Sequence, residues 1–339
     1  MLCHFLTDLT AAISLPLNMN ETPPRTLVSV VTPCFNEAGN VDELCDRLQA
    51  AFAKHPDIDF LHLFIDNAST DGTVAAIRRR MEQDSRIGYI TNMRNFGHVR
   101  SPLHGFLQAP GDVVIVMASD LQDPPELIGE FLSAWRQGAL VVAGVKRSSK
   151  ESGLMWLLRT LYYRTLSRIA SVDLIEHFTG FGLYDRLVVE EIRQVGDAYP
   201  YVRGLISELG FPVSRVEYDQ SVRRRGISKN NFYTLYDLAM TGITSHSKVP
   251  LRLAAMAGFA LSALSLAISL AYIVLKFIFW DSFSFGLAPV LIGIFFLGSV
   301  QLFFIGLVGE YVGAIHTQLH KRPLVIEKER VNFPPYGDA

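Results

Sequence analysis

Polar residues gather in four short clusters, and each cluster directly follows a short apolar run. The clusters occupy residues 33–37, 66–72, 92–97 and 119–123. Their carboxylates and amides suit the ribose and base of a nucleotide, the Arg94 guanidinium suits a phosphate, and the acidic residues of the last cluster suit a divalent cation. Together these residue types predict a site for a nucleotide diphosphate.

Other nucleotide and metal motifs are missing from the sequence. It contains no G-x-x-x-x-G-K-[ST] phosphate loop, and the G-F-G run at 180–182 lacks the third glycine of a dinucleotide fingerprint. His98, His177 and His246 are scattered without metal-ligand spacing, and the three cysteines form no C-x-x-C pair. NAD-dependent enzymes, P-loop hydrolases, zinc sites and disulfide frameworks are therefore disfavoured.

The elements that must position the four clusters follow an α/β pattern. Nearly all-apolar runs at 27–32, 60–65, 87–91, 113–118 and 140–145 predict parallel strands that are buried on both faces. Helical patterns fall between them at 41–54, 73–82 and 100–107. This alternation predicts a doubly wound, mostly parallel sheet, in which ligands bind beyond the carboxyl ends of the strands. The polar clusters lie at those ends.

The composition indicates a membrane protein and gives no reason to expect nucleic acid. Lys and Arg number 31 against 33 Asp and Glu, for a net charge of -2. About 23 uncharged residues separate Arg252 from Lys276, and about 28 separate Asp281 from Glu310, enough in each case to cross a bilayer core of about 30 Å. The alternative, a buried helical hairpin in a soluble protein, is disfavoured by the length of these stretches.

Basic residues flank the pair of predicted membrane helices on its outer sides. Lys248 and Arg252 precede the first helix, and Lys321 and Arg322 follow the second. The positive-inside rule then places the α/β portion and both termini in the cytosol, as in a bacterial-type inner (cytoplasmic) membrane protein with more than one span.

The chain is expected to divide into an N-terminal tail (1–26), a cytosolic α/β domain that holds the four polar clusters (27–229), an interfacial amphipathic helix (230–250), two membrane helices (251–279 and 285–311) and a cytosolic C-terminal tail (312–339). Apolar residues at helical spacing, Phe232, Tyr236, Met240 and Ile243, predict the interfacial helix. Residues 154–169 are a second candidate for such a helix. The first 26 residues do not have the pattern of a signal peptide. They are expected to be a disordered tail or a non-native start, since Met19 is another candidate first residue, and whether residues 1–18 are expressed stays open.

Five motifs follow one another along the chain: P-C-F-N-E at 33–37, D-N-A-S-T-D at 66–71, R-N-F-G at 94–97, D-L-Q-D-P-P-E at 120–126 and R-G-I-S-K at 225–229. In this order they resemble the motifs of the family 2 glycosyltransferases of GT-A fold. Within that family the chain is similar to the polyprenyl-phosphate sugar transferases, such as dolichyl-phosphate mannosyltransferases and bactoprenol glucosyltransferases. The resemblance extends from about residue 27 to residue 321 and also suggests self-association into a homo-oligomer.

The resemblance implies roles for individual residues. It implies nucleotide-sugar contacts from Pro33, Phe35, Asn36, Glu37, Asp66, Ser69, Asp71, Arg94, Asn95 and Gly97. It implies catalytic roles for Asp120, Asp123, Arg225 and Lys229, phosphate or acceptor binding by Arg203, Arg225, Ser228 and Lys229, and a cation held by Asp120 and Gln122. Other roles stay open from the residues alone. Asp66 and Asp71 would also suit turn caps, Arg203 a salt bridge, and the basic residues near Arg225 a collar that attracts anionic lipid.

Three positions depart from the family pattern. Ala118 stands where the family usually has the first carboxylate of D-x-D, Asn67 replaces the second Asp of D-D-G-S, and Gly180 occupies a position often held by Asp. Because Mg²⁺ usually keeps several waters and substrate phosphate oxygens, Asp120 and Gln122 could still hold Mg²⁺ or Mn²⁺ with the diphosphate. The departure at Ala118 predicts weaker cation binding.

The implied reaction is inverting transfer of a sugar from a UDP- or GDP-sugar to a polyprenyl phosphate on the cytosolic face of the membrane. A phosphate acceptor is largely ionised at pH 7, so the reaction needs little help from a general base. Two alternatives remain: a transferase that acts on a sugar hydroxyl in glycan elongation, and a non-catalytic membrane scaffold with a decayed metal site. The base and sugar of the donor, the lipid length and the downstream pathway are not determined by the sequence.

Overall fold

The computed structural model describes residues 25–148, 175, 178–197, 202–220, 249–279, 287–319 and 323–334. The strands are β1 (Thr26–Cys34), β2 (Ile58–Asp66), β3 (Ile87–Asn92), β4 (Val113–Val116), β5 (Val141–Ser148), β6 (Phe178–Asp185), β7 (Val213–Asp219) and β8 (Glu327–Val331). The helices are α1 (Val41–Phe52), α2 (Thr73–Gln83), α3 (Gly97–Gln108), the 3₁₀ turn η1 (Pro125–Leu127), α4 (Ile128–Arg136), α6 (Arg186–Val195), α7 (Val202–Leu209), α9 (Val249–Ile278) and α10 (Leu287–Leu319).

All eight strands belong to one sheet, in the order β7-β5-β6-β4-β1-β2-β3-β8. The central strands β4, β1, β2 and β3 are mutually parallel, and β7 is parallel to β5. β6 runs antiparallel to both β4 and β5, and β8 runs antiparallel to β3. The predicted α/β fold with a mostly parallel sheet is therefore confirmed, with antiparallel strands added at β6 and β8.

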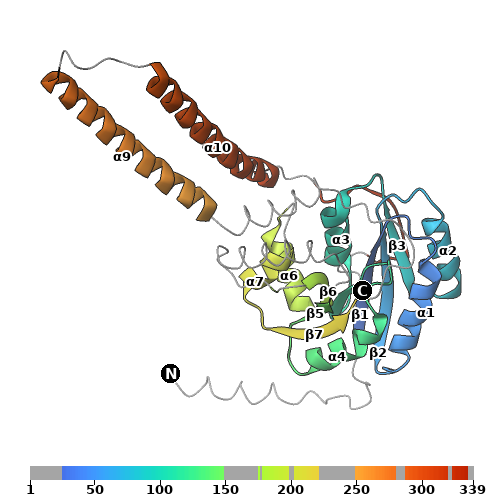
Figure 1. Ribbon diagram of the computed structural model, residues 1–339. Helices are drawn as coiled ribbons and strands as arrows, with labels where there is room; N and C mark the ends of the chain where they lie inside the picture. Colours follow the sequence, from blue (N-terminus) through green and yellow to red (C-terminus); the bar gives the residue numbers. More distant parts are fainter. Residues whose placement is uncertain are drawn as a thin grey trace, which may run out of the picture.

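Helices cover both faces of the sheet, as a doubly wound fold requires (Figure 1). One face packs against α1, α2 and α4 through residues such as Leu44, Ile77 and Phe131. The other face packs against α3, α6 and α7 through residues such as Phe106 and Val188. The predicted strands are nearly all buried because helices cover both faces of the central sheet. This burial explains why their sequences are almost entirely apolar.

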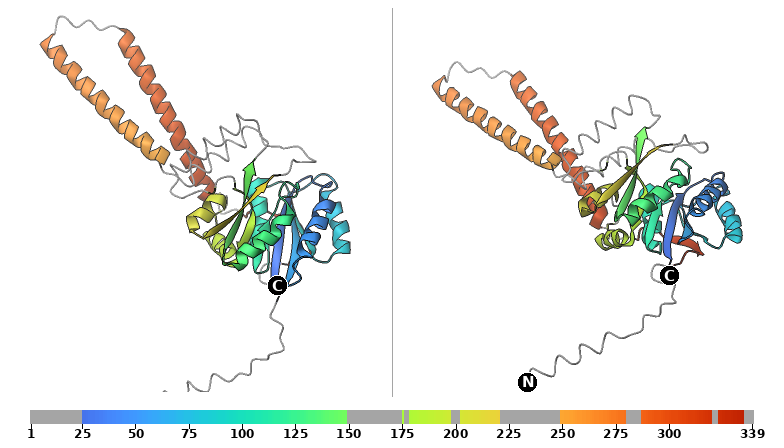
Figure 2. Two further views of the ribbon diagram at one scale, coloured as in Figure 1. Left: turned by 60° about the horizontal axis from the view of Figure 1, so that its bottom comes forward. Right: turned by 90° about the horizontal axis from the view of Figure 1, so that it is seen from below.

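Helices α9 and α10 extend away from the α/β domain as a pair (Figures 1 and 2). Both are long and apolar enough to cross a membrane, and their large side chains face outward: Phe259, Phe277 and Leu302 are all more than 70% exposed. An apolar surface of this extent suits lipid contact. The helices begin and end differently from the expected spans 251–279 and 285–311, since α9 covers 249–278 and α10 continues to Leu319.

The segment after α10 differs most from expectation. The sequence suggests a cytosolic tail over residues 312–339, but residues 327–331 form β8 at the edge of the sheet, beside β3. This strand is the red arrow in the right-hand view of Figure 2. The α/β domain is thus built from chain on both sides of the helix pair.

Several expectations concern residues beyond those described. The tail at 1–24, the helix candidate at 154–169 and nearly all of the interfacial helix at 230–250 lie outside the described residues. They remain predictions.

Candidate functional site

The four polar clusters meet at one edge of the sheet. β1, β2, β3 and β4 are parallel, and the register pairs Cys34 with Asp66 and Asp66 with Thr91, so the loops that follow these strands emerge side by side. Among the described residues, four non-glycine residues have positive φ, and three of them lie in these loops: Asn36 (58°), Ala68 (63°) and Leu121 (58°). Left-handed backbone at non-glycine residues is uncommon and concentrates at functional sites.

The loops after β1 and β2 are joined by hydrogen bonds. The Asn36 N–H donates to the Ser69 hydroxyl at 2.9 Å, and the Asn36 side-chain oxygen accepts from the Thr70 N–H at 2.8 Å. The Glu37 N–H donates to the Thr73 hydroxyl at 2.9 Å, and the buried Glu37 carboxylate accepts from Asn40 at 2.5 Å. These contacts fix the backbone of the first two motifs against each other.

Asp71 carries out the turn-capping role that the sequence left open. Its carboxylate accepts from the Thr73 N–H at 2.9 Å, from the Thr73 hydroxyl, and from the Ala38 N–H at 3.2 Å. Partial burial acts to raise the pKa of Asp71, but these hydrogen bonds outweigh it and the pKa is lowered. Asp71 therefore carries a negative charge at neutral pH, at the N-terminus of α2, where the helix dipole stabilises it.

Asp66 lies deeper, at the end of β2. It is fully buried and accepts from the Ser69 N–H at 3.1 and 3.3 Å. Burial raises the pKa of Asp66, and the Ser69 hydrogen bonds oppose the shift. Its carboxylate stabilises the 66–71 turn through the Ser69 N–H. The same position would suit a contact with a ligand group that reaches into the turn.

Asn67 joins the second loop to the third. Its side-chain nitrogen donates to Asn95 Oδ1 and to the Gly97 carbonyl, both at 3.0 Å. Its side-chain oxygen accepts from the Phe96 N–H at 2.8 Å and from Asn92 at 3.2 Å. The Asn67 amide thus acts both as donor and as acceptor. An aspartate, the usual residue of the family pattern at this position, could act only as acceptor when ionised.

Arg94 supplies an exposed cation at this edge. Its guanidinium lies 4.2 Å from the centre of the buried Phe96 ring and donates to the Asn95 carbonyl at 3.1 Å. The Asn95 side chain accepts from the Gly97 N–H at 2.8 Å, which shapes the turn at the start of α3. An arginine that rests on an aromatic ring keeps donors available for a phosphate.

The loop after β4 holds the acidic motif. Ser119 donates to the Pro33 carbonyl at 3.0 Å, which connects this loop to the first one, and the Gln122 N–H donates to Asp120 at 3.2 Å. Asp120 and Gln122 are half-buried. Among the described residues no group of three or more His, Cys, Asp or Glu gathers as a metal site. One carboxylate and one amide oxygen fit a cation only if substrate oxygens and water supply the other ligands.

Asp123 is buried against the neighbouring strand β7. It is 7% exposed and accepts from the Tyr218 hydroxyl of β7 at 2.7 Å. Burial raises the pKa of Asp123, while the Tyr218 hydrogen bond, the positive charge of Lys146 and the Ala118 N–H act in the opposite direction. Sequence reasoning missed Tyr218 and Lys146. For Tyr218, the alternating sequence V-S-R-V-E-Y-D of β7 was the available signal, because it indicates a strand with one face turned toward the protein.

The loops at 33–37, 66–71 and 94–97, where nucleotide-sugar contacts are expected, lie at the same edge of the sheet as Asp120 and Gln122, the expected cation ligands. The expected catalytic residue Asp123 is buried against Tyr218. Arg203 is the second residue of α7. Arg225, Ser228 and Lys229 lie outside the described residues, so their roles remain predictions.

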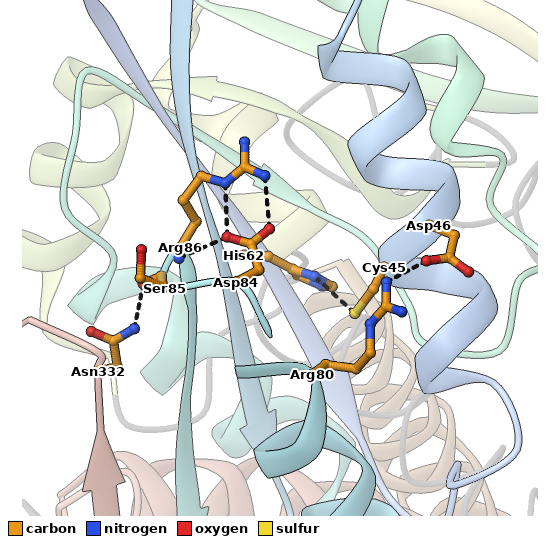
Figure 3. A network of polar contacts seen from close by, with 8 residues as sticks. All are labelled: Cys45, Asp46, His62, Arg80, Asp84, Ser85, Arg86 and Asn332. Atoms are coloured by element: carbon orange, nitrogen blue, oxygen red, sulfur yellow. Dashed lines mark hydrogen bonds and ion pairs between the residues drawn. The ribbon is translucent and has the colours of Figure 1, made fainter. Parts of the chain in front are cut away.

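A second polar cluster lies away from this edge, where the chain enters β3 (Figure 3). A surface cavity of about 320 Å³ is lined there by α1, α2 and residues 84–86. Its charges are paired: Arg86 donates to Asp84 at 2.7 and 2.9 Å, and Arg80 pairs with Asp46. In the protein interior nearby, Nδ1 of the buried His62 lies 3.7 Å from the Cys45 sulfur. These contacts join α1, α2 and β2, so we assign the cluster a structural role.

Comparison with known proteins gives consistent matches. The family model described as glycosyl transferase family 2 matches residues 29–193. The chain is 32% identical over 299 residues to the uncharacterized glycosyltransferase YkcC of Bacillus subtilis (strain 168), an alignment that covers 88% of this chain and 92% of that protein. It is 31% identical over 303 residues to the bactoprenol glucosyl transferase of Shigella phage SfII, covering 89% and 97%.

Among solved structures, the mannosyltransferase PcManGT from Pyrobaculum calidifontis, in complex with GDP-Man and Mn²⁺, is 15% identical with a TM-score of 0.45. The superposition covers 88% of this chain and 89% of that one.

Proposed function

This chain belongs to glycosyl transferase family 2, and from that premise we propose that it transfers a sugar from a UDP- or GDP-sugar to a polyprenyl phosphate, with inversion at the anomeric carbon. The observation that carries the proposal is the extent of the similarity to a bactoprenol glucosyl transferase. The alignment covers 97% of that protein and is not confined to residues 29–193, which the family model matches. Bactoprenol is a polyprenol, so the shared length supports a lipid acceptor.

The site chemistry supports a phosphate acceptor. The second pKa of a phosphate monoester is about 6, so its attacking oxygen is already largely ionised at neutral pH. Gly180, where the family often has Asp, has no side chain to remove a proton, and its φ of +99° favours glycine there. A sugar hydroxyl would require a base, whereas a lipid phosphate requires alignment and charge stabilisation.

Charge develops on the leaving nucleoside diphosphate, and the loop residues are placed to stabilise it. Arg94, in the loop after β3, offers an exposed guanidinium, and Asp120 and Gln122, in the loop after β4, offer oxygen ligands. A divalent cation, when bound by Asp120, Gln122 and the diphosphate, would neutralise part of that charge. Arg225 and Lys229 are proposed to bind the acceptor phosphate, and Asp123 to orient the sugar or the acceptor.

The fold also supports a membrane topology. β8 follows α10 in the chain, yet pairs with β3, which precedes α9. With both helices spanning the membrane, this pairing supports a topology in which both outer ends of the helix pair lie on the side that holds the sheet. The flanking basic residues favour the cytosol for that side, where nucleotide sugars and the lipid phosphate would meet.

The proposal is tested with the purified full-length protein, a panel of UDP- and GDP-sugars, and a polyprenyl phosphate, with the lipid fraction read by mass spectrometry. A polyprenyl-phosphate sugar is the expected product. Its loss with EDTA would support the cation, and its persistence would assign charge stabilisation to Arg94 and its neighbours. Folded protein that gives no lipid product but glycosylates a sugar alcohol would overturn the lipid acceptor, and folded protein inactive with every pair would favour the scaffold.

A matched pair of variants ties the activity to the acidic loop. Asp120→Asn removes the carboxylate that we assign to the cation and should lower turnover at least about a hundredfold. Glu82→Gln alters an exposed carboxylate near the end of α2, away from the motif loops, and should leave turnover unchanged.

A further inference from the structure

The segment that follows α10 contacts the Arg94 loop directly. β8 pairs with β3 through Tyr89 to Asn92, with a register shift between Thr91 and Asn92. The pairing then continues beyond the strand, because the Met93 N–H donates to the Ile326 carbonyl at 2.9 Å. The residue immediately before Arg94 is therefore held by the C-terminal segment.

The same segment holds the helix on the other side of the loop. α3 begins at Gly97, and its residues 100, 104 and 108 lie on one face at four-residue spacing. Arg100 donates to the Pro323 carbonyl at 2.5 Å, and His104 Nε2 lies 2.6 Å from Glu327 Oε1. Arg330 donates to the Gln108 side chain at 2.8 Å. Residues 323–330 thus contact the strand before the loop and the helix after it.

These contacts are shielded from solvent and closely packed. The side chains of His104 and Glu327 are 15% and 26% exposed, and Glu327 also accepts from Arg330 at 2.5 and 3.0 Å. Val325, which precedes β8 in the sequence, and Phe333, which follows it, are both buried. The tail approaches β3 so closely that a Cβ at Gly88 would lie 2.0 Å from the Asn332 carbonyl oxygen. The Glu327–Arg330 ion pair is partly buried and is therefore screened less than a surface pair. Burial lowers the pKa of His104, so its contact with Glu327 is a hydrogen bond from a neutral imidazole.

We infer that the residues of segment 323–331 that contact Met93 and α3, namely Pro323, Ile326, Glu327 and Arg330, are a positioning element for the Arg94 loop, so that the donor site is complete only when the segment after the second membrane helix is docked on β3 and α3. The inference rests on the proposed function, since it assigns Arg94 to the donor diphosphate. Glu327 is its central positioning residue, because it joins β8 to α3 through His104.

The test compares two substitutions on the same strand. Glu327→Gln weakens the contacts to His104 and Arg330, whereas Glu329→Gln weakens a contact with Arg78, which lies on α2. We expect Glu327→Gln to raise KM for the nucleotide sugar about threefold to tenfold with little change in kcat or in KM for the lipid, and Glu329→Gln to stay within about twofold of wild type. Equal donor KM values for the two variants, or a loss confined to kcat, would overturn the inference.

Direct binding of UDP and GDP to wild type and both variants, measured by titration calorimetry, separates this inference from the proposed reaction. Weaker nucleotide binding by Glu327→Gln alone would support the positioning role even if the lipid acceptor were wrong. Unchanged binding in all three proteins would overturn it.

Discussion

At the scale of single residues, the departure from the family pattern at Asn67 is matched by the hydrogen-bonding groups around it. An aspartate at this position has no side-chain N–H, so it could not donate to Asn95 Oδ1 or to the Gly97 carbonyl. Three oxygens would then face one another within a partly buried turn. The asparagine is thus matched to Asn95 and to the loop that carries Arg94.

Asn67→Asp, which restores the family's residue, is therefore expected to impair this protein. Leaving these partly buried acceptors without their donors should cost about 1 kcal/mol, the low end of the range for buried groups, and the disturbed turn should raise KM for the nucleotide sugar. Thermal unfolding in detergent and steady-state kinetics check the two effects. A variant as stable and as active as wild type would show that the amide donors are not required.

Tyr218 provides a second test at this scale. Its hydroxyl donates to Asp123 and lowers the carboxyl's pKa, so Tyr218→Phe should raise the pKa of Asp123 further. If ionised Asp123 is needed, the acid limb of the kcat/KM profile should then move to higher pH. Tyr184→Phe is the control, because the Tyr184 hydroxyl donates to the neutral Gly180 carbonyl at 3.0 Å. The same acid-limb shift in both variants would contradict the assignment.

At the scale of elements, the strands that the sequence revealed are those with a strong packing signal. β1 to β4 are apolar because helices cover both faces, and the loops after them were located correctly for the same reason. β8, with the sequence E-K-E-R-V, is an edge strand rich in charge, so it has no apolar run to detect. Hydrogen-bond partners such as Asn67 with Asn95 and Tyr218 with Asp123 join residues distant in sequence, and no local pattern reports them.

The packing of α1 on β1 and β2 gives a pH prediction. His62 is fully buried, lies 3.0 Å from the Thr32 hydroxyl, and has its pKa lowered by burial to about 3. Between that value and about 6.5 the unfolded chain binds a proton that the folded chain does not, so stability falls as pH falls through this window. From pH 7 to pH 5 the loss from His62 is about 2 kcal/mol.

Comparison of wild type with His62→Gln checks this value. The glutamine does not titrate, so its unfolding free energy should decrease less between pH 7 and pH 5, whatever other groups contribute to both proteins. Parallel pH profiles for the two proteins would show that His62 is protonated in the folded state or is not buried.

At the scale of the whole molecule, the α/β domain and the helix pair cannot be separated by a single cut in the chain. The edge strand β8 (residues 327–331) follows α10 in the sequence, so the sheet is complete only when the chain includes both helices and the segment after them. A catalytic domain ended before α9 would therefore expose the edge of β3, a surface prone to pairing with other strands. Few residues separate the end of α10 at Leu319 from Pro323 and Ile326, which contact α3 and Met93.

This arrangement makes a topology prediction that labelling can check. In a Cys3→Ser background, where the remaining Cys34 and Cys45 are buried, single cysteines are introduced as Glu82→Cys in the domain, Lys328→Cys in β8 and Ser282→Cys between the two helices. A membrane-impermeant maleimide should label the first two only in inside-out vesicles and the third only in right-side-out vesicles. Labelling of Glu82→Cys and Lys328→Cys from opposite sides would refute the β3–β8 pairing, because a strand cannot hydrogen-bond across a bilayer. Labelling of both from the outer side would keep the pairing and reverse the proposed orientation, which would remove the site from the cytosolic pool of nucleotide sugars.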